Sequence, residues 1–445
     1  MQYPPVGHEY RQTLEYLYTR LPMFSRIGAA ALKPDLTNTL ALCAALGNPE
    51  RKFRSIHIAG TNGKGSTSHM LAAIMQNAGF KTGLYTSPHL VDFRERIRIN
   101  GEPVSEEFVN RFVAAQKPLI ESVSPSFFEI TVAMAFAAFA EAEVDIAIIE
   151  TGLGGRLDST NVITPELSII TNISLDHTDL LGNTIAEIAR EKAGIIKSSI
   201  PVIIGIATDE AKAVFDTTAT DRQAPIYYSA ERWTLSRLKD SNPGLQHFTA
   251  TSPNDLLLDI ITDLTGSYQQ DNIAAVLTAV EILTNQGWPL KLDKAAAALR
   301  AVKNTTGLRG RWDVLQNSPL IIADVAHNPA GLETVLKDWK HIPAKKKHIV
   351  VGFVRDKDVA AALALFPSDA VYYFCAADTP RALPAAELAA IAMESGLTGT
   401  VYPSVTEAVL TARAQLRTDD ALLITGSFFI VGEAMQTFSG MALGE

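Results

Sequence analysis

A glycine-rich turn with a single lysine is the stretch of this sequence best suited to chemistry. Alternating apolar residues precede the turn, as at the end of a buried strand, and apolar residues at helical spacing follow it. A strand, a glycine-rich turn and a helix bind phosphate, because backbone N–H groups and the helix N-terminus point at the anion. Lysine adds a full positive charge, so we favour a phosphate loop over a plain turn with a chance lysine. The predicted loop consists of Gly60, Thr61, Asn62, Gly63, Lys64, Gly65 and Ser66.

This loop departs from the usual phosphate-loop pattern, G-x-x-x-x-G-K-[ST], at two positions. Ile58 stands where the first glycine is expected, and Gly65 stands where a magnesium-binding hydroxyl is expected. A magnesium ion beside this loop would therefore need oxygen ligands from other parts of the chain.

Polar residues gather where other predicted strands end. Ser87 and His177 each follow an apolar run, and Glu150 ends one. Ligands collect at the carboxyl ends of strands in open α/β sheets, and these groups beside a phosphate loop suit a hard cation such as Mg²⁺. Histidine would also suit Mn²⁺. Each residue alone has a structural interpretation, but their joint placement favours a metal site. Lys192, on the next helix, is by itself best interpreted as an exposed lysine paired with a nearby glutamate.

Composition excludes several classes of protein. The chain has 445 residues, 47 % of them hydrophobic and 20 % charged, as in a soluble globular enzyme. Its net charge of −9 argues against binding to nucleic acid or to anionic membranes. The two cysteines, Cys43 and Cys375, form no C-x-x-C pair, and no secretory signal or membrane-spanning run is expected. We predict a cytoplasmic protein, and a monomer because no heptad pattern is visible.

Apolar runs of strand length alternate with helical patterns, which predicts a mainly parallel sheet covered on both faces. The pattern breaks at residues 303–310 (KNTTGLRG) and then restarts. We therefore predict two domains, 1–303 with the phosphate loop and a smaller α/β domain, 304–445. The predicted strands are 81–85, 145–150, 167–171, 201–206, 320–323, 348–353, 370–374 and 422–425, with a hairpin over 95–101. The predicted helices include 130–142, 271–285, 292–302 and one beginning after Ser105, and residues 207–265 are predicted to be mixed and β-like.

Nine motifs occur in an order that resembles folylpolyglutamate synthases and bifunctional dihydrofolate synthases of the Mur ligase superfamily. They are GTNGKGS, YTSPHL, SFFEIT, ETGLGGRLDSTN, TNISLDH, EKAGIIK, GRW, DVAHNP and GSFFIVG. The resemblance implies a P-loop ATPase domain joined to a smaller Rossmann-like domain, with the active site between them. It also implies ATP, L-glutamate and a reduced folate as substrates, with dihydropteroate as a further acceptor.

The chemistry implied by the resemblance is ligation through an acyl phosphate. ATP phosphorylates a substrate carboxylate, the amino group of glutamate attacks, and phosphate leaves as the amide forms. A carboxylate is a poor acceptor because its oxygen does not leave, and conversion to phosphate removes that obstacle. Catalysis would then rest mainly on positioning and on charge neutralisation.

The resemblance also implies roles for individual residues. ATP would contact the phosphate loop, Asn272, Arg311 and Asp324, although Arg309 is close enough in sequence to exchange roles with Arg311. The implied magnesium ligands are Ser87, Glu150, His177 and Lys192, the last as an N6-carbamate formed with CO₂. Incoming glutamate would meet Arg96, His327 and Ser427, and the implied catalytic residues are Lys64, Lys192 and His327. Without the resemblance, Arg96 would be interpreted as a solvent-exposed residue on an edge hairpin.

The resemblance implies that two segments bind the folate substrate. They contribute Ser126, Phe127, Phe128, Glu129, Leu157, Asp158 and Ser159. Aromatic rings there would stack on a pterin and Asp158 would accept its N–H groups, whereas the alternative for the phenylalanines is ordinary core packing.

Two other functions stay open. One is a Mur-type ligase acting on a UDP-sugar peptide, which the SFFEIT and LDST segments disfavour. The other is a nucleotide-dependent switch or binding module without ligase chemistry.

Overall fold

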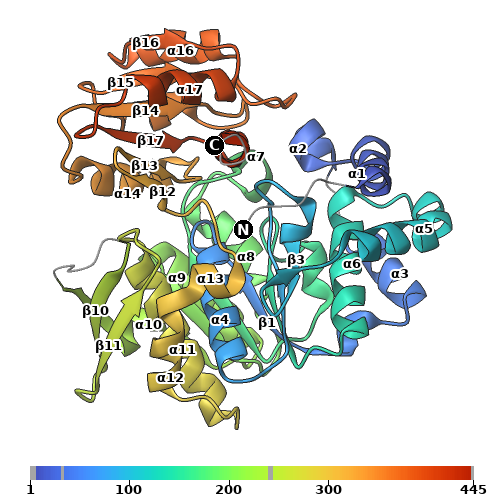
Figure 1. Cartoon of the computed structure of the whole chain (residues 1–445). Helices are drawn as coiled ribbons and strands as arrows, with labels where there is room; N and C mark the ends of the chain where they lie inside the picture. Colours follow the sequence, from blue (N-terminus) through green and yellow to red (C-terminus); the bar gives the residue numbers. More distant parts are fainter. Residues whose placement is uncertain (1–6, 32–34, 239–243, 442–445) are drawn as a thin grey trace.

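Two α/β units lie one above the other in the computed structural model, which describes residues 7–31, 35–238 and 244–441 (Figure 1). The larger unit is built on an eight-stranded sheet with a three-stranded sheet beside it, and the smaller unit on a six-stranded sheet. The N-terminal stretch 1–6, part of the region expected to lack a secretory signal, is outside the described residues. None of the helices in the described ranges combines the length and apolarity needed to cross a bilayer.

The eight-stranded sheet has the order β4-β3-β2-β5-β1-β6-β7-β8. Its parallel strands are β1 (Arg54–Ala59), β2 (Thr82–Tyr85), β5 (Ile146–Glu150), β6 (Leu167–Asn172), β7 (Val202–Ile206) and β8 (Ile226–Tyr228). Antiparallel strands β3 (Ile97–Ile99) and β4 (Glu102–Pro103) extend one edge. Because β2, β5, β1 and β6 are neighbours, their carboxyl ends bring the phosphate loop together with Ser87, Glu150 and His177.

Helices cover both faces of this sheet, as its continuous apolar strands require. On one face α4 (Lys64–Asn77) and α11 (Gln269–Asn285) pack against Ile56 and Ile58. On the other face α6 (Phe127–Glu141) packs against Ile149, and α8 (Ile185–Ala193) and α9 (Asp209–Asp221) pack further along. The remaining helices of this unit are α1 (His8–Arg20), α2 (Phe24–Ile27), α3 (Thr37–Ala45), α5 (Glu106–Val123), α7 (Thr178–Leu181), α10 (Ser229–Arg232), α12 (Leu292–Ala298) and α13 (Val302–Thr306).

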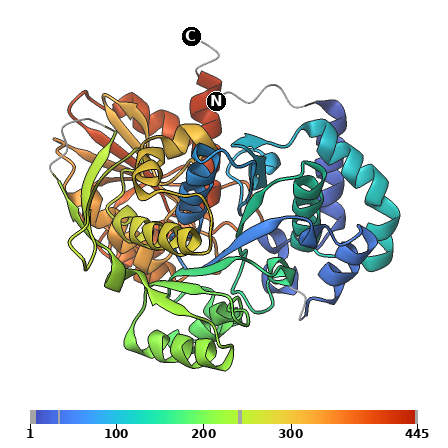
Figure 2. The ribbon, with the colours of Figure 1, turned by 90° about the horizontal axis from the view of Figure 1, so that it is seen from below.

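The three-stranded sheet is antiparallel and has the order β11-β10-β9. Its strands are β9 (Thr234–Arg237), β10 (Gln246–Thr251) and β11 (Leu257–Thr262). It lies on the opposite side of the molecule from α1 and α5 (Figures 1 and 2). The prediction for residues 207–265 was right about these strands and missed α9, which Thr208 caps by accepting a hydrogen bond from Ala211.

The six-stranded sheet has the order β12-β13-β17-β14-β15-β16 and is parallel except for β12. Its strands are β12 (Asp313–Asn317), β13 (Leu320–Ala323), β14 (Lys347–Val351), β15 (Val371–Phe374), β16 (Gly399–Val401) and β17 (Ala421–Thr425). Its helices are α14 (Pro329–Lys340), α15 (Val359–Leu363), α16 (Ala385–Glu394), α17 (Val405–Gln415) and α18 (Phe428–Met441). The four strands predicted here are confirmed, and the two edge strands β12 and β16 were not foreseen. The predicted fold class, with its two α/β units, is confirmed.

Two element boundaries differ from the predictions because of local capping. Helix α6 begins at Phe127, not at residue 130, because Ser126 and Glu129 form a reciprocal capping box. The predicted hairpin strand over residues 95–99 begins only at Ile97, because a second capping box at Asp92 turns the preceding residues into a 3₁₀ helix.

The chain crosses between the two units after α13. This helix packs on α4 of the larger unit, and β12 of the smaller unit starts at Asp313. The boundary predicted between residues 303 and 304 falls inside α13. We propose a boundary within residues 307–312 instead.

Candidate active site

Every site residue predicted from the sequence lines one cavity of about 1170 Å³, to which both α/β units contribute. The larger unit supplies the phosphate loop, the strand ends of β2, β5 and β6, and the start of α6. The smaller unit supplies the loop after β13 and the start of α18. Residues far apart in the sequence therefore meet around a volume large enough for more than one substrate.

The phosphate loop is held by its own lysine and by close packing. Lys64 Nζ donates to the carbonyl oxygens of Gly60 and Thr61, each at 3.0 Å. Gly63 has a φ of +85°, and a Cβ there would lie 2.3 Å from Oδ1 of Asn272. Only glycine fits at residue 63, because both its left-handed backbone and the lack of space exclude a side chain. The predicted proximity of Asn272 to this loop is thus a direct packing contact.

Gly65 lies beside two charged side chains. A Cβ at this position would lie 3.4 Å from Nη2 of Arg311 and 3.8 Å from Oε2 of Glu150. A serine or threonine would bring further atoms into that space. The position where a magnesium-binding hydroxyl is usual is therefore flanked by a guanidinium and a carboxylate, each at ordinary contact distance.

Glu150 and His177 have the chemistry of metal ligands. The backbone N–H of Ser87 donates to Oε2 of Glu150 at 3.2 Å, and within the described residues its Oε1 has no hydrogen-bond donor. Burial raises the pKa of Glu150, whereas the charges of Lys64 and Arg311 lower it. Burial lowers the pKa of His177 to about 3, so its imidazole is neutral at physiological pH, as metal ligation requires.

Lys192 is buried, and the interpretation as an exposed lysine paired with a glutamate is wrong. Its Nζ donates to the carbonyl oxygen of Gly60 at 2.9 Å, so it shares that oxygen with Lys64. Burial lowers the pKa of Lys192 to about 7, which makes the neutral amine accessible near neutral pH. The neutral amine is the form that reacts with CO₂.

The donor set fits Mg²⁺ on one condition. No group of three or more His, Cys, Asp or Glu side chains in the described ranges is placed to hold a metal ion. Glu150 and Ser87 supply hard oxygen donors and His177 a neutral nitrogen, but the ammonium of Lys192 would repel a cation. The set fits once Lys192 carries a carbamate, because that group replaces a positive charge with anionic oxygens.

The two candidate linker arginines have different surroundings. Arg309 Nε pairs with Oδ2 of Asp313, the first residue of β12, at 2.6 Å. The guanidinium of Arg311 instead lies 5.0 Å from the ring centroid of Phe428 and lines the large cavity. The structure therefore places Arg311, rather than Arg309, in the cavity beside the phosphate loop.

Asp324 is buried and its carboxylate ties the smaller unit to α11. Its Oδ2 accepts hydrogen bonds from the hydroxyl of Tyr268 at 2.8 Å and from the backbone of Trp312 at 2.7 Å. Its Oδ1 accepts from the backbone of Ala326 at 2.9 Å. Tyr268, which the sequence did not single out, precedes α11 and lines the cavity, so its hydrogen bond joins the two units at the cavity wall.

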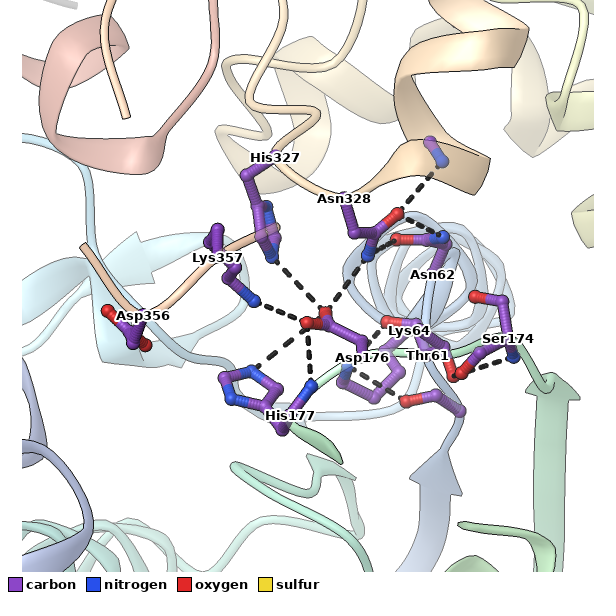
Figure 3. Close-up of polar contacts among 12 residues, drawn as sticks. Thr61, Asn62, Lys64, Ser174, Asp176, His177, His327, Asn328, Asp356 and Lys357 are labelled. Carbon is purple, nitrogen blue, oxygen red and sulfur yellow. Dashed lines mark hydrogen bonds and ion pairs between the residues drawn. The ribbon is translucent and has the colours of Figure 1, made fainter. Parts of the chain in front are cut away.

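Asp176 is the meeting point of a second set of contacts between the units (Figure 3). Asn328 Nδ2 donates to its Oδ2 at 3.0 Å, Lys357 Nζ donates to its Oδ1, and His327 Nε2 lies 3.6 Å from its Oδ2. These three partners belong to the smaller unit. Asp176 and Asn328 lie in the motifs TNISLDH and DVAHNP but were given no role, and Lys357 was missed altogether.

The residues expected to receive glutamate lie on both sides of the cavity. Arg96 is buried, with its Nε donating to Nδ1 of His89 at 2.8 Å and its guanidinium 5.3 Å from the ring of Phe127. The interpretation of Arg96 as a solvent-exposed residue on an edge hairpin is therefore wrong. On the facing side, His327 Nδ1 contacts the carbonyl of Val325 at 2.9 Å, and Ser427 Oγ accepts from the backbone of Ile430 at the start of α18.

The predicted folate residues divide into structural and exposed groups. Ser126 and Glu129 cap α6, and Phe127 is buried against Phe93, so these side chains support the cavity wall. Leu157 is 39 % exposed and available for contact. Phe128 packs on Gly152, where a Cβ would lie 2.4 Å from its ring.

Asp158 is engaged by its own loop rather than free. Its Oδ2 accepts from the backbone of Gly152 and Leu153, both at 2.8 Å, and its Oδ1 accepts from the backbone of Thr160 at 3.0 Å. A pterin N–H would have to share an oxygen with these donors.

Comparison with known proteins agrees with this architecture. Residues 58–280 match the Mur ligase middle domain, and residues 310–428 match the Mur ligase glutamate ligase domain. The chain is 35 % identical over 411 residues to the dihydrofolate synthase/folylpolyglutamate synthase of Bacillus subtilis, covering 90 % of this chain and 94 % of that protein. This chain belongs to the folylpolyglutamate synthase/dihydrofolate synthase family of Mur ligases.

Similarity to this folylpolyglutamate synthase/dihydrofolate synthase family extends over nearly the whole chain. The folylpolyglutamate synthase of Lacticaseibacillus casei is 34 % identical over 442 residues, covering 97 % of this chain and 99 % of that protein. The structure of Escherichia coli FolC in complex with DHPP and ADP superposes with a TM-score of 0.85 at 29 % identity, covering 99 % of this chain and all of that one (100 %). The resemblance seen in the nine motifs is confirmed.

Proposed function

We propose that this chain is an ATP-dependent ligase that joins L-glutamate to folates through an acyl phosphate, with release of ADP and phosphate. The observation that carries the proposal is the shared cavity. Part of its lining is the phosphate loop, and other parts come from the glutamate ligase domain and from the segments proposed to bind folate. The relatives are named for this activity, and the E. coli structure was solved with ADP.

The chain's own residues supply positioning and positive charge. Lys64 now bonds loop carbonyls and lies beside Glu150, so its ammonium is placed to move to phosphate oxygens of ATP when these enter the loop. Arg311 approaches the same place from the linker. Two cations converging on the transferred phosphoryl group would stabilise the charge that develops on it.

Mg²⁺ would be held by Glu150, Ser87, His177 and the carbamate of Lys192. Bound there, the ion would neutralise charge on the phosphates of ATP. The chain's contribution is to keep the imidazole of His177 neutral, to fix one carboxylate oxygen of Glu150 through the backbone of Ser87, and to hold the Lys192 side chain beside Gly60.

Glutamate would bind between Arg96 and the loops of the smaller unit. The guanidinium of Arg96 suits a carboxylate by bidentate pairing, and its contact with His89 fixes its direction. His327 and Ser427 would orient the amino acid from the facing side, so that its amine reaches the acyl phosphate. Because these groups come from both units, relative placement of the units would control the attack.

We propose dihydropteroate as a second acceptor, which would make the enzyme bifunctional. The support is the apolar surface formed by Phe128 on Gly152 together with exposed Leu157, which suits a flat ring. We further propose a monomer acting in the cytoplasm, where ATP is available and where two buried free thiols, Cys43 and Cys375, stay reduced.

The test is product formation that depends on both ATP and L-glutamate, with tetrahydrofolate and 7,8-dihydropteroate as separate acceptors. Both should be glutamylated with stoichiometric release of ADP. Turnover of tetrahydrofolate alone would refute the proposed dihydrofolate synthase activity. Absence of turnover with either acceptor would refute the ligase assignment.

A further inference from the structure

A buried chain of hydrogen bonds runs from the strand of the phosphate loop to the loop that bears Asp158. His57 lies in β1 and is fully buried. Its Nε2 is 2.8 Å from Oγ1 of Thr160, and that hydroxyl donates to Oδ1 of Asp158 at 2.5 Å. Thr160 is also fully buried, so water does not compete for either bond.

The unpaired ring nitrogen of His57 shows which atoms donate in these hydrogen bonds. Within the described residues, Nδ1 of His57 is buried and has no hydrogen-bond partner. Burial lowers the pKa of His57 to about 3, so the ring is neutral and carries one proton. A buried N–H without an acceptor costs more than a lone pair without a donor, which places the proton on Nε2. His57 therefore donates to Thr160, and Thr160 donates to Asp158.

At its Asp158 end, this series of hydrogen bonds reaches a loop that lines the cavity. Oδ2 of Asp158 holds the backbone N–H groups of Gly152 and Leu153, each at 2.8 Å. Gly152 in turn supports the ring of Phe128, with no room for a Cβ between them. Rotation of the Asp158 carboxylate would release this loop. The hydroxyl of Thr160, together with its backbone N–H, holds Oδ1 in place and so fixes Oδ2.

We propose that Thr160 and His57 are positioning residues for the acceptor substrate, acting through Asp158 on the loop that faces Phe128. The inference rests on the proposed function, because it assumes that the pterin end of the acceptor binds at this loop. Within the described residues, none of these three side chains hydrogen-bonds to the phosphate loop. Loss of the Thr160 hydroxyl should therefore weaken binding of the acceptor and spare ATP.

The experiment compares Thr160→Val, which keeps the shape and removes the hydroxyl, with Thr160→Ser, which keeps the hydroxyl. With 7,8-dihydropteroate as acceptor, Thr160→Val should raise the KM for the acceptor about tenfold. The KM for ATP should stay within about twofold of the wild-type value. Thr160→Ser should restore the acceptor KM, and thermal unfolding of each variant shows whether it is folded.

A matched control is available at Thr39, a fully buried threonine in α3. Its hydroxyl has no partner among the described residues, so Thr39→Val makes the same chemical change without breaking a bond. We expect the kinetic constants of Thr39→Val to match those of the wild type. His57→Leu should raise the acceptor KM as Thr160→Val does, and the double variant should add little because both act through one chain.

Three outcomes would overturn the positioning role: an unchanged acceptor KM in Thr160→Val, an equal rise in the KM for ATP, or no recovery in Thr160→Ser. Failure of the proposed function is recognised separately. A wild-type protein that glutamylates no folate acceptor would refute the ligase itself and the positioning role with it. An active wild type with an unaffected Thr160→Val variant refutes the positioning role alone.

Discussion

The side-chain amides of Asn62 and Asn328 hydrogen-bond to each other in both directions, at 3.2 and 3.1 Å, although 266 residues separate them. Asn62 belongs to the phosphate loop, and Asn328 caps α14 by accepting from the backbone of Gly331. Asn328 also donates to Asp176. One side chain of the smaller unit thus contacts the phosphate loop, a second strand-end loop and its own helix, so the docking of the units depends on the shape of the phosphate loop.

Replacement of Asp176 by Asn should impair catalysis by loosening this docking. The change leaves buried Lys357 without its carboxylate partner, at a cost of about 3 kcal/mol in unfolding free energy, and removes the charge beside His327. We expect kcat/KM for glutamate to fall at least about tenfold. Asp179→Asn, an exposed change three residues further on, is the control. Unchanged kinetics with glutamate in Asp176→Asn would contradict the docking role.

Arg311 and Arg309 form a natural pair for mutagenesis. Because Arg311 lines the cavity beside Gly65, Arg311→Ala should raise the KM for ATP or lower kcat by roughly 10- to 100-fold. Arg309→Ala breaks an ion pair with Asp313 of β12 and should leave both constants within about threefold of wild type. Steady-state kinetics with ATP as the varied substrate measures both. The reverse ranking of the two variants would move the nucleotide contact to Arg309.

Lys192→Ala should abolish ligation, since it removes both the carbamate and its oxygen donors. Added short carboxylates such as acetate should restore part of the activity by occupying the same place. Arg190→Ala, at an exposed cation on the same helix, should remain active. Labelling with ¹³CO₂ gives an independent measurement, because a carbamate carbon is visible by NMR in the wild type and lost in the variant. Full activity of Lys192→Ala would exclude a metal-binding role for this residue.

Asp263 should make stability depend on pH. Burial raises the pKa of Asp263 to about 6, and its buried Oδ1 has no partner among the described residues. Folding therefore favours the protonated acid. Its stabilising contribution is complete below the unfolded value near 4, and it is lost as the pH rises through 6.

Asp263→Asn should stabilise the protein at pH 8 by roughly 1–2 kcal/mol, after allowance for screening of this partly exposed group. The gain should vanish near pH 4, where the wild-type side chain is already neutral. Urea unfolding at the two pH values measures the difference. A variant less stable than the wild type at pH 8 would show that the carboxylate is favourably ionised in the fold.

Much of the fold followed from local patterns in the sequence. The phosphate loop, the strand-end residues Ser87 and Glu150, and the four inner strands of the smaller unit were predicted because burial on both faces gives continuous apolar runs. Edge strands β12 and β16 were not predicted, because β12 is only partly buried and β16 is exposed, so neither gives a continuous apolar run. The start of α6 could have been predicted, since Ser126 and Glu129 have the spacing of a capping box.

Contacts between distant segments were beyond reach of local patterns. Lys357 lies in a polar stretch with no feature that distinguishes it from an exposed lysine, and its partner Asp176 is 181 residues away. The burial of Arg96 depends on His89 and Phe127, which reach it from other elements. Such pairings are properties of the tertiary fold and not of a sequence window.

The position of Arg311 limits how freely the two units can be recombined between relatives. Its backbone leads directly into β12 of the smaller unit, while its guanidinium lies against the phosphate loop of the larger one. A chimera joined within residues 307–312 would pair a linker from one parent with a phosphate loop from another. A junction placed before Gly307 would transfer the linker intact, but the imported arginine would still have to match a foreign glycine and carboxylate. These ligase units are therefore less interchangeable than their separate sheets suggest.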